Sequence, residues 1–261
     1  KRTAKMANSI NVNVGAMVAL QNLNASNRQL AVTQNRVSTG MNVSSAKDNG
    51  AIYAIATNQR AELGALDAVR QSLQRGQSIV DVALAAGDTV VNALTEMKSL
   101  AVAIEAGGST ATTDALQADY DAYQEEINAA LAGANFDGTN LFEDTGKTVI
   151  TDTAGSTKTI GFAAAVTVAP ATATADGVQA ALESFTANLA TLGTQSKSLE
   201  RTTTFTSKME DALEAGIGNL VDADLAKESA KLTALQTKQQ LGVQALSIAN
   251  SSSSILLGLF R

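Results

Sequence analysis

The sequence predicts a mainly helical protein in which the two ends of the chain pair as a long antiparallel coiled coil. Apolar residues recur three, four and seven residues apart near both ends of the 261-residue chain, the pattern of helices that pack along one stripe. Aromatic residues are only 3% of the chain and one Pro is present. The 45% hydrophobic content is therefore mostly small and aliphatic, which suits closely packed helices. Gly and β-branched residues gather in a short middle segment, which predicts a small β-hairpin region.

The first helix is expected over about residues 10–37. Its apolar positions are Val14, Met17, Leu20, Leu23, Leu30 and Val37. Gly40 lies just past the end of this pattern, where Gly commonly closes a helix. Residues 44–48 (SSAKD) then offer side-chain oxygens to cap the next helix.

A second, longer helix carries sustained seven-residue spacing. One ladder contains Leu66, Leu73, Val80, Leu94 and Ala101, and a neighbouring ladder contains Leu63, Leu84 and Val91. Gly64, Gly76 and Gly87 interrupt it, each at a cost of about 1 kcal/mol relative to Ala. We interpret them as points where another backbone comes close, with tolerated surface glycines as the alternative. Residues 107–110 (GGST) break this helix, and another is expected over 114–131.

The middle segment, about residues 134–175, is expected to hold the β structure. Residues 148–151 and 159–162 predict two strands, and 152–156 (DTAGS) predict the turn between them. Residues 163–168 (AAAVTV), which end in β-branched residues, predict a third strand before Pro170. Helical spacing then returns from Val178 to Leu220, before a further helix that begins near residues 222–224 (DAD).

The last helix carries two ladders. One contains Leu225, Leu232, Gln239 and Leu246, and the other contains Leu235, Gly242, Ala249 and Leu256. Neither terminal helix can bury its stripe alone, so each needs the other or a neighbouring copy. The apolar end of the chain, residues 255–260, adds to this expectation of a partner surface.

Composition excludes several classes of function. His and Cys are absent, so the commonest general base, thiolate metal sites and disulfides are excluded. A formal net charge of −6 argues against a nucleic-acid partner, and the terminal apolar run is too short to cross a bilayer. We therefore expect no enzyme, no catalytic, metal or cofactor site, no nucleic-acid binding and no membrane insertion.

Four stretches resemble bacterial flagellins. They are residues 38–51 (STGMNVSSAKDNGA), 134–142 (ANFDGTNLF), 221–230 (VDADLAKESA) and the tail from 246 to 261. They occur in the family's order and cover both ends and the edge of the middle. The Asn-rich start and residues 47–51 are similar to alphaproteobacterial flagellins in particular.

The resemblance implies an inner coiled-coil domain from residues 1–42 plus 222–261. It implies a second helical domain from 43–221, with β-hairpins at about 134–175 and no large outer domain. It also implies a secreted subunit of the extracellular flagellum, exported unfolded by the flagellar type III apparatus, that polymerises for motility. The implied partners are other copies of the chain, an export chaperone, the filament cap and hook–filament junction proteins. A hook–filament junction protein, or another coiled-coil surface protein, is the alternative.

Two sets of residues are candidate sites, one for assembly and one for recognition by a receptor. The expected assembly residues are Leu20, Leu23, Leu30, Leu225, Leu232, Leu235, Leu246 and Leu256. In many flagellins an innate immune receptor recognises a helix written Leu-x-Arg-hydrophobic-Arg-Glu-Leu-Ala. The equivalent positions here include Leu94, Glu96, Lys98, Ser99 and Leu100, where Glu96 reverses a charge and Ser99 replaces a carboxylate. We expect weak or absent activation of that receptor.

Overall fold

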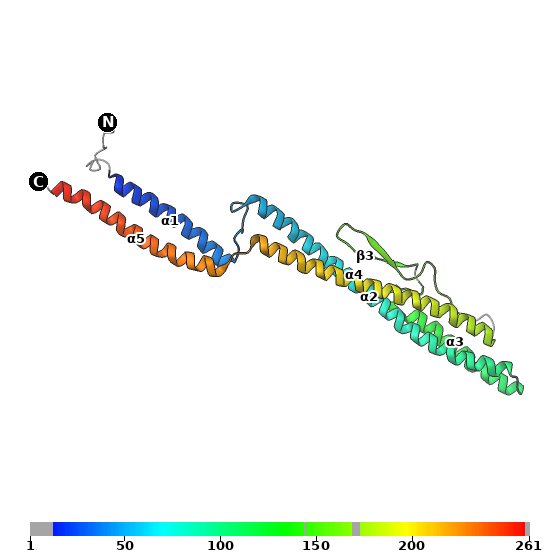
Figure 1. Ribbon diagram of the computed structural model, residues 1–261. Coiled ribbons are helices and arrows are strands. Elements are labelled where there is room, and N and C mark those ends of the chain that lie inside the picture. Colours follow the sequence, from blue (N-terminus) through cyan, green and yellow to red (C-terminus); the bar gives the residue numbers. More distant parts are fainter. Residues whose placement is uncertain (1–12, 144, 169–172, 259–261) are drawn as a thin grey trace. The chain divides into compact units, whose positions relative to one another are not determined.

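The computed structural model describes residues 13–143, 145–168 and 173–258, with side chains described as far as Ser251. These residues form five helices and two small antiparallel hairpins, so the prediction of a mainly helical chain with a β-hairpin region is confirmed. The chain divides into two compact units (Figure 1). The first unit contains residues 1–60 with 215–261, and the second contains residues 61–214.

The first unit is built on two helices from opposite ends of the chain, α1 (Val14–Thr39) and α5 (Leu225–Gly258). They lie side by side and antiparallel (Figure 1). The Asn13 side chain caps α1 by accepting a hydrogen bond from the Ala16 N–H at 3.0 Å. At its other end, Gly40 takes a left-handed conformation (φ 72°) and donates its N–H to the Arg36 carbonyl at 2.9 Å. The predicted Gly stop is thus observed.

Helix α2 (Gly50–Glu105) begins at a cap one residue later than the expected group. The Asn49 side-chain oxygen accepts hydrogen bonds from the N–H groups of Ala51 and Ile52. Asp48 instead closes the preceding turn, because its carboxylate accepts the N–H and hydroxyl groups of Ser44 and Ser45. Those hydrogen bonds, chiefly from Ser45, lower the pKa of Asp48 below its ordinary value.

The second unit packs parts of α2 and α4 (Ala175–Val221) with α3 (Thr110–Gly133) around one core. The ladder residues Leu73, Val80, Leu94 and Ala101 are all completely buried there. Among the described residues, α2 is long and apolar enough to cross a membrane by length and composition. Its apolar residues instead supply much of this helical core.

Two hairpins lie against the helices of the second unit. The short strands β1 (Asn135–Phe136) and β2 (Thr139–Asn140) are joined by Asp137 and Gly138, both with positive φ (53° and 73°). Positive φ at both turn residues is the geometry that two-residue Asp-Gly hairpins favour. The Asn140 side chain anchors this hairpin by donating to the Leu131 carbonyl of α3 at 2.7 Å.

The second hairpin pairs β3 (Lys147–Ile150) with β4 (Thr157–Ile160), close to the two predicted strands. Asp152 closes its turn by accepting the Ser156 N–H at 2.8 Å. The predicted third strand at 163–168 is wrong, because that segment pairs with no strand in the described part of the chain. Instead, the Val166 N–H donates to the Phe142 carbonyl at 2.7 Å, and the Val168 carbonyl accepts from the Gln124 side chain of α3 at 3.0 Å.

Two of the three helix glycines in α2 lie where another element comes close. A Cβ on Gly76 would meet Val149 of β3 at 2.7 Å, and one on Gly87 would overlap Leu189 of α4. Gly64 has nothing within 4 Å. Gly76 and Gly87 therefore do lie at close contacts, but the neighbouring atoms belong to side chains and not to another backbone as predicted, and Gly64 is a tolerated surface glycine.

Candidate functional site

The facing sides of α1 and α5 form a seam with heptad spacing. We define the terminal seam by its less exposed positions, which are Ala16, Ala19, Leu23, Ser26, Leu30, Thr33 and Val37 on α1, and Leu232, Leu235, Gln239, Gly242, Leu246 and Ala249 on α5. The intervals alternate between three and four residues on both helices, as knobs-into-holes packing requires. Of the predicted assembly residues, Leu23, Leu30, Leu232, Leu235 and Leu246 therefore lie in this seam.

Small and polar side chains occupy much of the terminal seam. Ser26 and Thr33 are buried, and the Thr33 hydroxyl has no hydrogen-bond partner among the described residues. Gly242 allows α5 to approach Leu23 so closely that a Cβ there would lie 3.2 Å from Leu23 Cδ1. Little apolar surface is buried per turn in such a seam, so the pair gains less from packing than a Leu-rich coiled coil does.

Large apolar side chains are found on the outer faces of the same two helices. Leu20 is 47% exposed and Leu225 is 49% exposed, so neither predicted assembly residue is buried within the subunit. The other exposed positions are Val14, Met17, Val18, Val32, Leu241, Val243 and Ile248. We call these nine residues the outer apolar set. The Leu256 side chain lies outside the described residues.

The predicted apolar positions missed five residues of this set, which are Val18 and Val32 on α1 and Leu241, Val243 and Ile248 on α5. A signal was available for α5, since its apolar residues are spread around the helix and are not gathered in one stripe. Apolar residues outside the stripe that faces α1 must then lie on the outer face.

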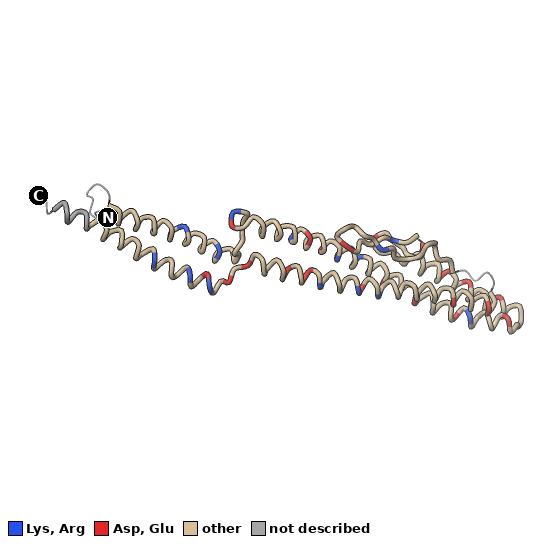
Figure 2. The backbone as a smooth tube through the Cα atoms, turned by 45° about the horizontal axis from the view of Figure 1, so that its top comes forward, with Lys and Arg blue, Asp and Glu red and all other residues tan. Residues whose placement is uncertain are grey.

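Charge is absent from the half of each helix nearest the chain ends. The sequence has no Asp, Glu, Lys or Arg from residue 14 to 27 or from 239 to 258. Figure 2 shows the described part of these stretches as an unbroken tan run. Polar groups there bond across the pair, because Asn13 donates to the Ala249 carbonyl at 2.7 Å and Gln239 donates to Asn27 at 2.9 Å.

An ion cluster joins the C-terminal end of α1 to the N-terminal end of α5. Arg36 Nη1 lies 3.3 Å from Glu228 Oε1, and Lys231 Nζ lies 3.7 Å from the other Glu228 oxygen. Glu228 is buried with 8% of its surface exposed. Leaving a charge in such a site without its partner is unfavourable, so this cluster favours one register of α1 against α5.

The Asp-Ala-Asp turn between α4 and α5 is tied to the segment after α1. The Asp224 carboxylate caps α5 by accepting the Lys227 N–H at 3.1 Å, as predicted. The Ala223 N–H donates to the Gly40 carbonyl at 2.8 Å, and the Asn42 N–H donates to the Val221 carbonyl at 2.7 Å. These bonds hold the end of α1 beside the start of α5 within the first unit.

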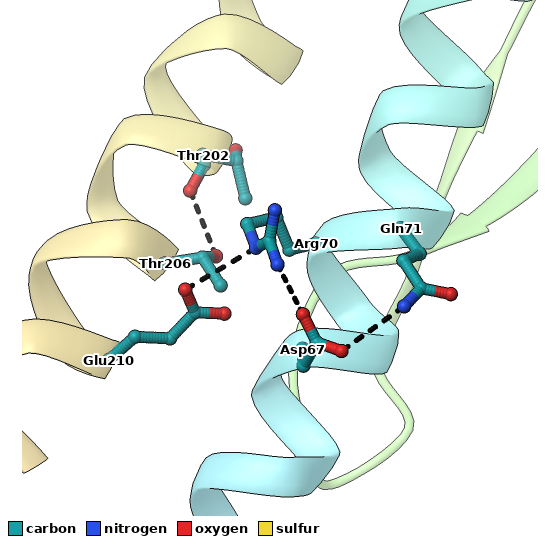
Figure 3. Close-up of polar contacts among 6 residues, drawn as sticks. All are labelled: Asp67, Arg70, Gln71, Thr202, Thr206 and Glu210. Carbon is teal, nitrogen blue, oxygen red and sulfur yellow. Dashed lines mark hydrogen bonds and ion pairs between the residues drawn. The ribbon is translucent and has the colours of Figure 1, made fainter. Parts of the chain in front are cut away.

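In the second unit, α2 and α4 are joined by a polar cluster (Figure 3). Arg70 of α2 pairs with Asp67 on its own helix, and its Nε lies 3.4 Å from Glu210 Oε2 of α4. The hydrogen bond and charge of Asp67, followed by the charge of Glu210, raise the pKa of Arg70. Thr206 of α4 lies beside the Arg70 side chain and is buried. The cluster therefore links α2 to α4 through ion pairs, which is a structural role.

The stretch equivalent to the receptor-binding helix is divided between core and surface. Leu94 is completely buried. Lys98 donates to the Gln179 side chain of α4 at 2.6 Å. Glu96 and Ser99 are exposed and Leu100 is half-buried. Glu96 and Ser99 are thus accessible to a partner, and they are the two positions that depart most from the family pattern.

Within the described residues, no group of three or more His, Cys, Asp or Glu is placed to hold a metal ion. The features that stand out there are the outer apolar set and the uncharged helix halves. Both are properties of surfaces that pack against other protein, and neither has the polar groups that a catalytic site needs.

Comparisons with known proteins agree with this arrangement. A family model for the bacterial flagellin N-terminal helical region matches residues 10–147, and one for the C-terminal helical region matches residues 175–260. The chain is 49% identical to flagellin FljM of Caulobacter vibrioides over 97% of its length and 99% of the relative. It is 50% identical to FljK of the same organism, again over 97% and 99% of the two chains. Identity with a Brucella melitensis flagellin is 37%, with the same coverage.

Caulobacter vibrioides and Brucella melitensis are both alphaproteobacteria, so the predicted similarity to that group is confirmed. Flagellins are structural proteins, the subunits of the extracellular filament of the bacterial flagellum. The helical ends, the turns at 134–142 and 221–230, and the matches along nearly the whole chain all lead to one assignment: this chain belongs to the bacterial flagellin family.

Proposed function

We propose that this chain self-assembles into a flagellar filament through α1 and α5, with the outer apolar set as its main contact surface. The observation that carries the proposal is the exposure of large apolar residues such as Met17 (63%) and Ile248 (69%) on helices without charge in these stretches. Burying such side chains against another copy contributes about 25 cal/mol per Å² of apolar surface. The predicted inner domain, residues 1–42 with 222–261, would then be completed by neighbouring subunits.

In this proposal, residues 43–221 form the wall around the inner domain. Their middle segment holds only two small hairpins among its described residues, which favours a filament without a large outer domain. The chain would be exported unfolded by the flagellar type III apparatus. An export chaperone would keep its apolar ends from aggregating, and the filament cap and hook–filament junction proteins would contact those ends during assembly.

Electron microscopy of concentrated purified protein tests this proposal. The full chain is expected to form filaments, and a chain lacking residues 222–261 is expected to form none. A finer variant replaces Leu241 and Val243 by Gln, which removes exposed apolar surface without touching the terminal seam. Its matched control replaces Gln240 and Gln244, exposed on the same turns, by Ala. A full chain that stays monomeric at every concentration and in the presence of filament seeds contradicts the proposal.

The receptor-equivalent stretch gives a second expected result. We expect this protein to activate the flagellin receptor in a reporter-cell assay at least roughly tenfold less potently than an enterobacterial flagellin. The reason is that exposed Glu96 places a carboxylate where the family pattern has Arg, which juxtaposes like charges or loses a pair. Glu96→Arg together with Ser99→Glu is expected to raise potency. Equal potency of the unmodified protein and the enterobacterial protein would show that this stretch does not set recognition.

A further inference from the structure

Helix α4 presents a stripe of cations around one exposed aromatic ring. The basic stripe consists of Lys197, Arg201, Phe205 and Lys208, all exposed. At 3.6 residues per turn, intervals of four, four and three place these residues within a sector of about 80°. Phe205 is 62% exposed. Alongside residues 197–208 no acidic residue falls in this sector, since Glu200, Glu210 and Asp211 all lie outside it.

The basic stripe has no partner within the described part of the chain. None of its three cations forms an ion pair with any described carboxylate. Large aromatic side chains and Arg are enriched at protein interfaces, and charged side chains such as Lys are typical of the polar rim that surrounds the centre. Phe205 ringed by cations therefore has the composition of an interface centre with its rim.

An acidic pocket of complementary character lies between α2 and α3 of the same unit. The acidic pocket is lined by three acidic residues, Glu96, Asp119 and Glu126, together with Leu100 and Tyr123 among others. Its volume is about 430 Å³, within the size range of pockets that accept small organic groups, so one phenyl ring fits in it. No Lys or Arg lines it, and none of its three carboxylates forms an ion pair with a described residue.

The two surfaces cannot meet within one molecule. The hydrogen bond between Lys98 and Gln179 places the acidic pocket level with Gln179 on α4. From Gln179 to Arg201 there are 22 residues of continuous helix, which is about 33 Å at 1.5 Å per residue. A contact between them therefore needs two copies of the chain.

We propose that the basic stripe of one subunit docks into the acidic pocket of a second copy, with Phe205 inserted beside Leu100 and Tyr123 and the cations paired to the surrounding carboxylates. The argument is charge complementarity joined to a fitting hollow. Because the two surfaces are different, the contact is head-to-tail, and a repeated head-to-tail contact produces an open helical polymer. This inference rests on the proposed self-assembly and names one of its contacts in the second unit.

Charge reversal tests the pairing. The stripe variant carries Arg201→Glu with Lys208→Glu, and the pocket variant carries Glu96→Lys with Glu126→Lys. Each is expected to raise the critical concentration for polymerisation, measured by light scattering and electron microscopy, at least roughly tenfold. The variant with all four changes again sets two charges of one sign on the stripe against two of the other sign at the pocket, with Lys197 and Asp119 unchanged, and is expected to return to within about threefold of the wild-type value. In a 1:1 mixture of the two reversed variants, contacts between unlike variants attract in both directions and contacts between like variants repel, so the mixture is expected to polymerise better than either reversed variant alone.

The controls reverse exposed charges near these surfaces but outside them. Glu125→Lys on α3 and Lys147→Glu on β3 are expected to leave the critical concentration within about twofold of wild type. Wild-type behaviour of both reversed variants overturns the inference, as does a four-change variant no better than the two from which it is built. Far-UV circular dichroism establishes that each variant keeps its helices.

A disulfide test does not depend on filament formation. The chain has no Cys, so Ser99→Cys in one sample and Thr204→Cys in another place single thiols at the pocket and beside the stripe. Under mild oxidation the mixture is expected to give at least roughly five times more linked dimer than either sample alone, or than Ser99→Cys mixed with Ala187→Cys. Absence of that excess overturns the contact. If the wild-type chain forms no filaments but the mixture of cysteine variants shows the excess, the proposed self-assembly is refuted and the contact stands.

Discussion

Replacing Phe185 by Ala is expected to lower the free energy of unfolding of the second unit by about 3–5 kcal/mol. Phe185 lies on α4 with 1% of its surface exposed. Its ring centroid is 5.7 Å from that of Phe142, which in turn stacks on Phe162 at 6.0 Å. Truncation leaves a cavity and removes the aromatic contact between α4 and the segment that follows the first hairpin.

Urea unfolding followed by circular dichroism measures this change. Phe205→Ala is a matched control, since it makes the same chemical change on the same helix at a side chain that is 62% exposed. We expect its free energy of unfolding to stay within about 0.5 kcal/mol of wild type. Equal losses for the two variants would show that Phe185 is not a core residue. The control also separates stability from assembly, because Phe205→Ala is expected to weaken only the contact between copies.

The helical part of the fold could be predicted from sequence because each of its signals is local. Heptad spacing predicted α2. Capping residues predicted the ends of other helices, since Gly40 ends α1 and Asp224 caps α5 as expected. Helix lengths were underestimated: α3 was expected from 114 to 131 and runs from Thr110, where the Ser109 side chain caps it. A capping Ser directly after two glycines was the available signal.

The β region was predicted less well because a strand needs a partner that local pattern does not name. Residues 163–168 end in the β-branched residues Val166, Thr167 and Val168, which favour a strand, but the chain turns away from β4 at Gly161, which has φ 90°. A Cβ at Gly161 would lie 2.9 Å from Leu141 Cδ2, so packing against Leu141 requires a Gly there. The turn at Asp137 and Gly138 was recognised by its sequence, yet its two-residue strands are too short to show any periodicity.

The candidate site shows the same limit. Ladder counting selects large apolar residues, whereas the terminal seam buries Ser26 and Thr33 and leaves Leu20 and Leu225 outside. Spacing cannot tell which of two apolar stripes on α1 faces α5 and which faces another subunit. The roles of these residues in assembly remain predictions that the filament experiments address.

Gly242→Leu is expected to separate α1 from α5 and to prevent filament formation. A Cβ at this position already lies 3.2 Å from Leu23 Cδ1 and 4.0 Å from the Leu23 backbone, so a larger aliphatic side chain has no space unless the helices move apart. Overpacking of this kind costs about 1–3 kcal/mol. In a seam of small residues that loss is a large fraction of what packing provides, so α5 would no longer present the outer apolar set in register with α1.

Gly216→Leu is the matched control, because Gly216 lies in a helix of the same unit with nothing within 4 Å of its Cβ position. There the change gains helix propensity, up to about 1 kcal/mol, and filaments should form as in wild type. Assembly is scored by electron microscopy and the helix pair by circular dichroism of the monomer. A second-site change, Leu23→Ala, makes room for the larger side chain on α5 and is expected to restore at least part of the assembly. Filaments from Gly242→Leu alone at the wild-type critical concentration would show that close approach of α1 and α5 is not needed for the polymer.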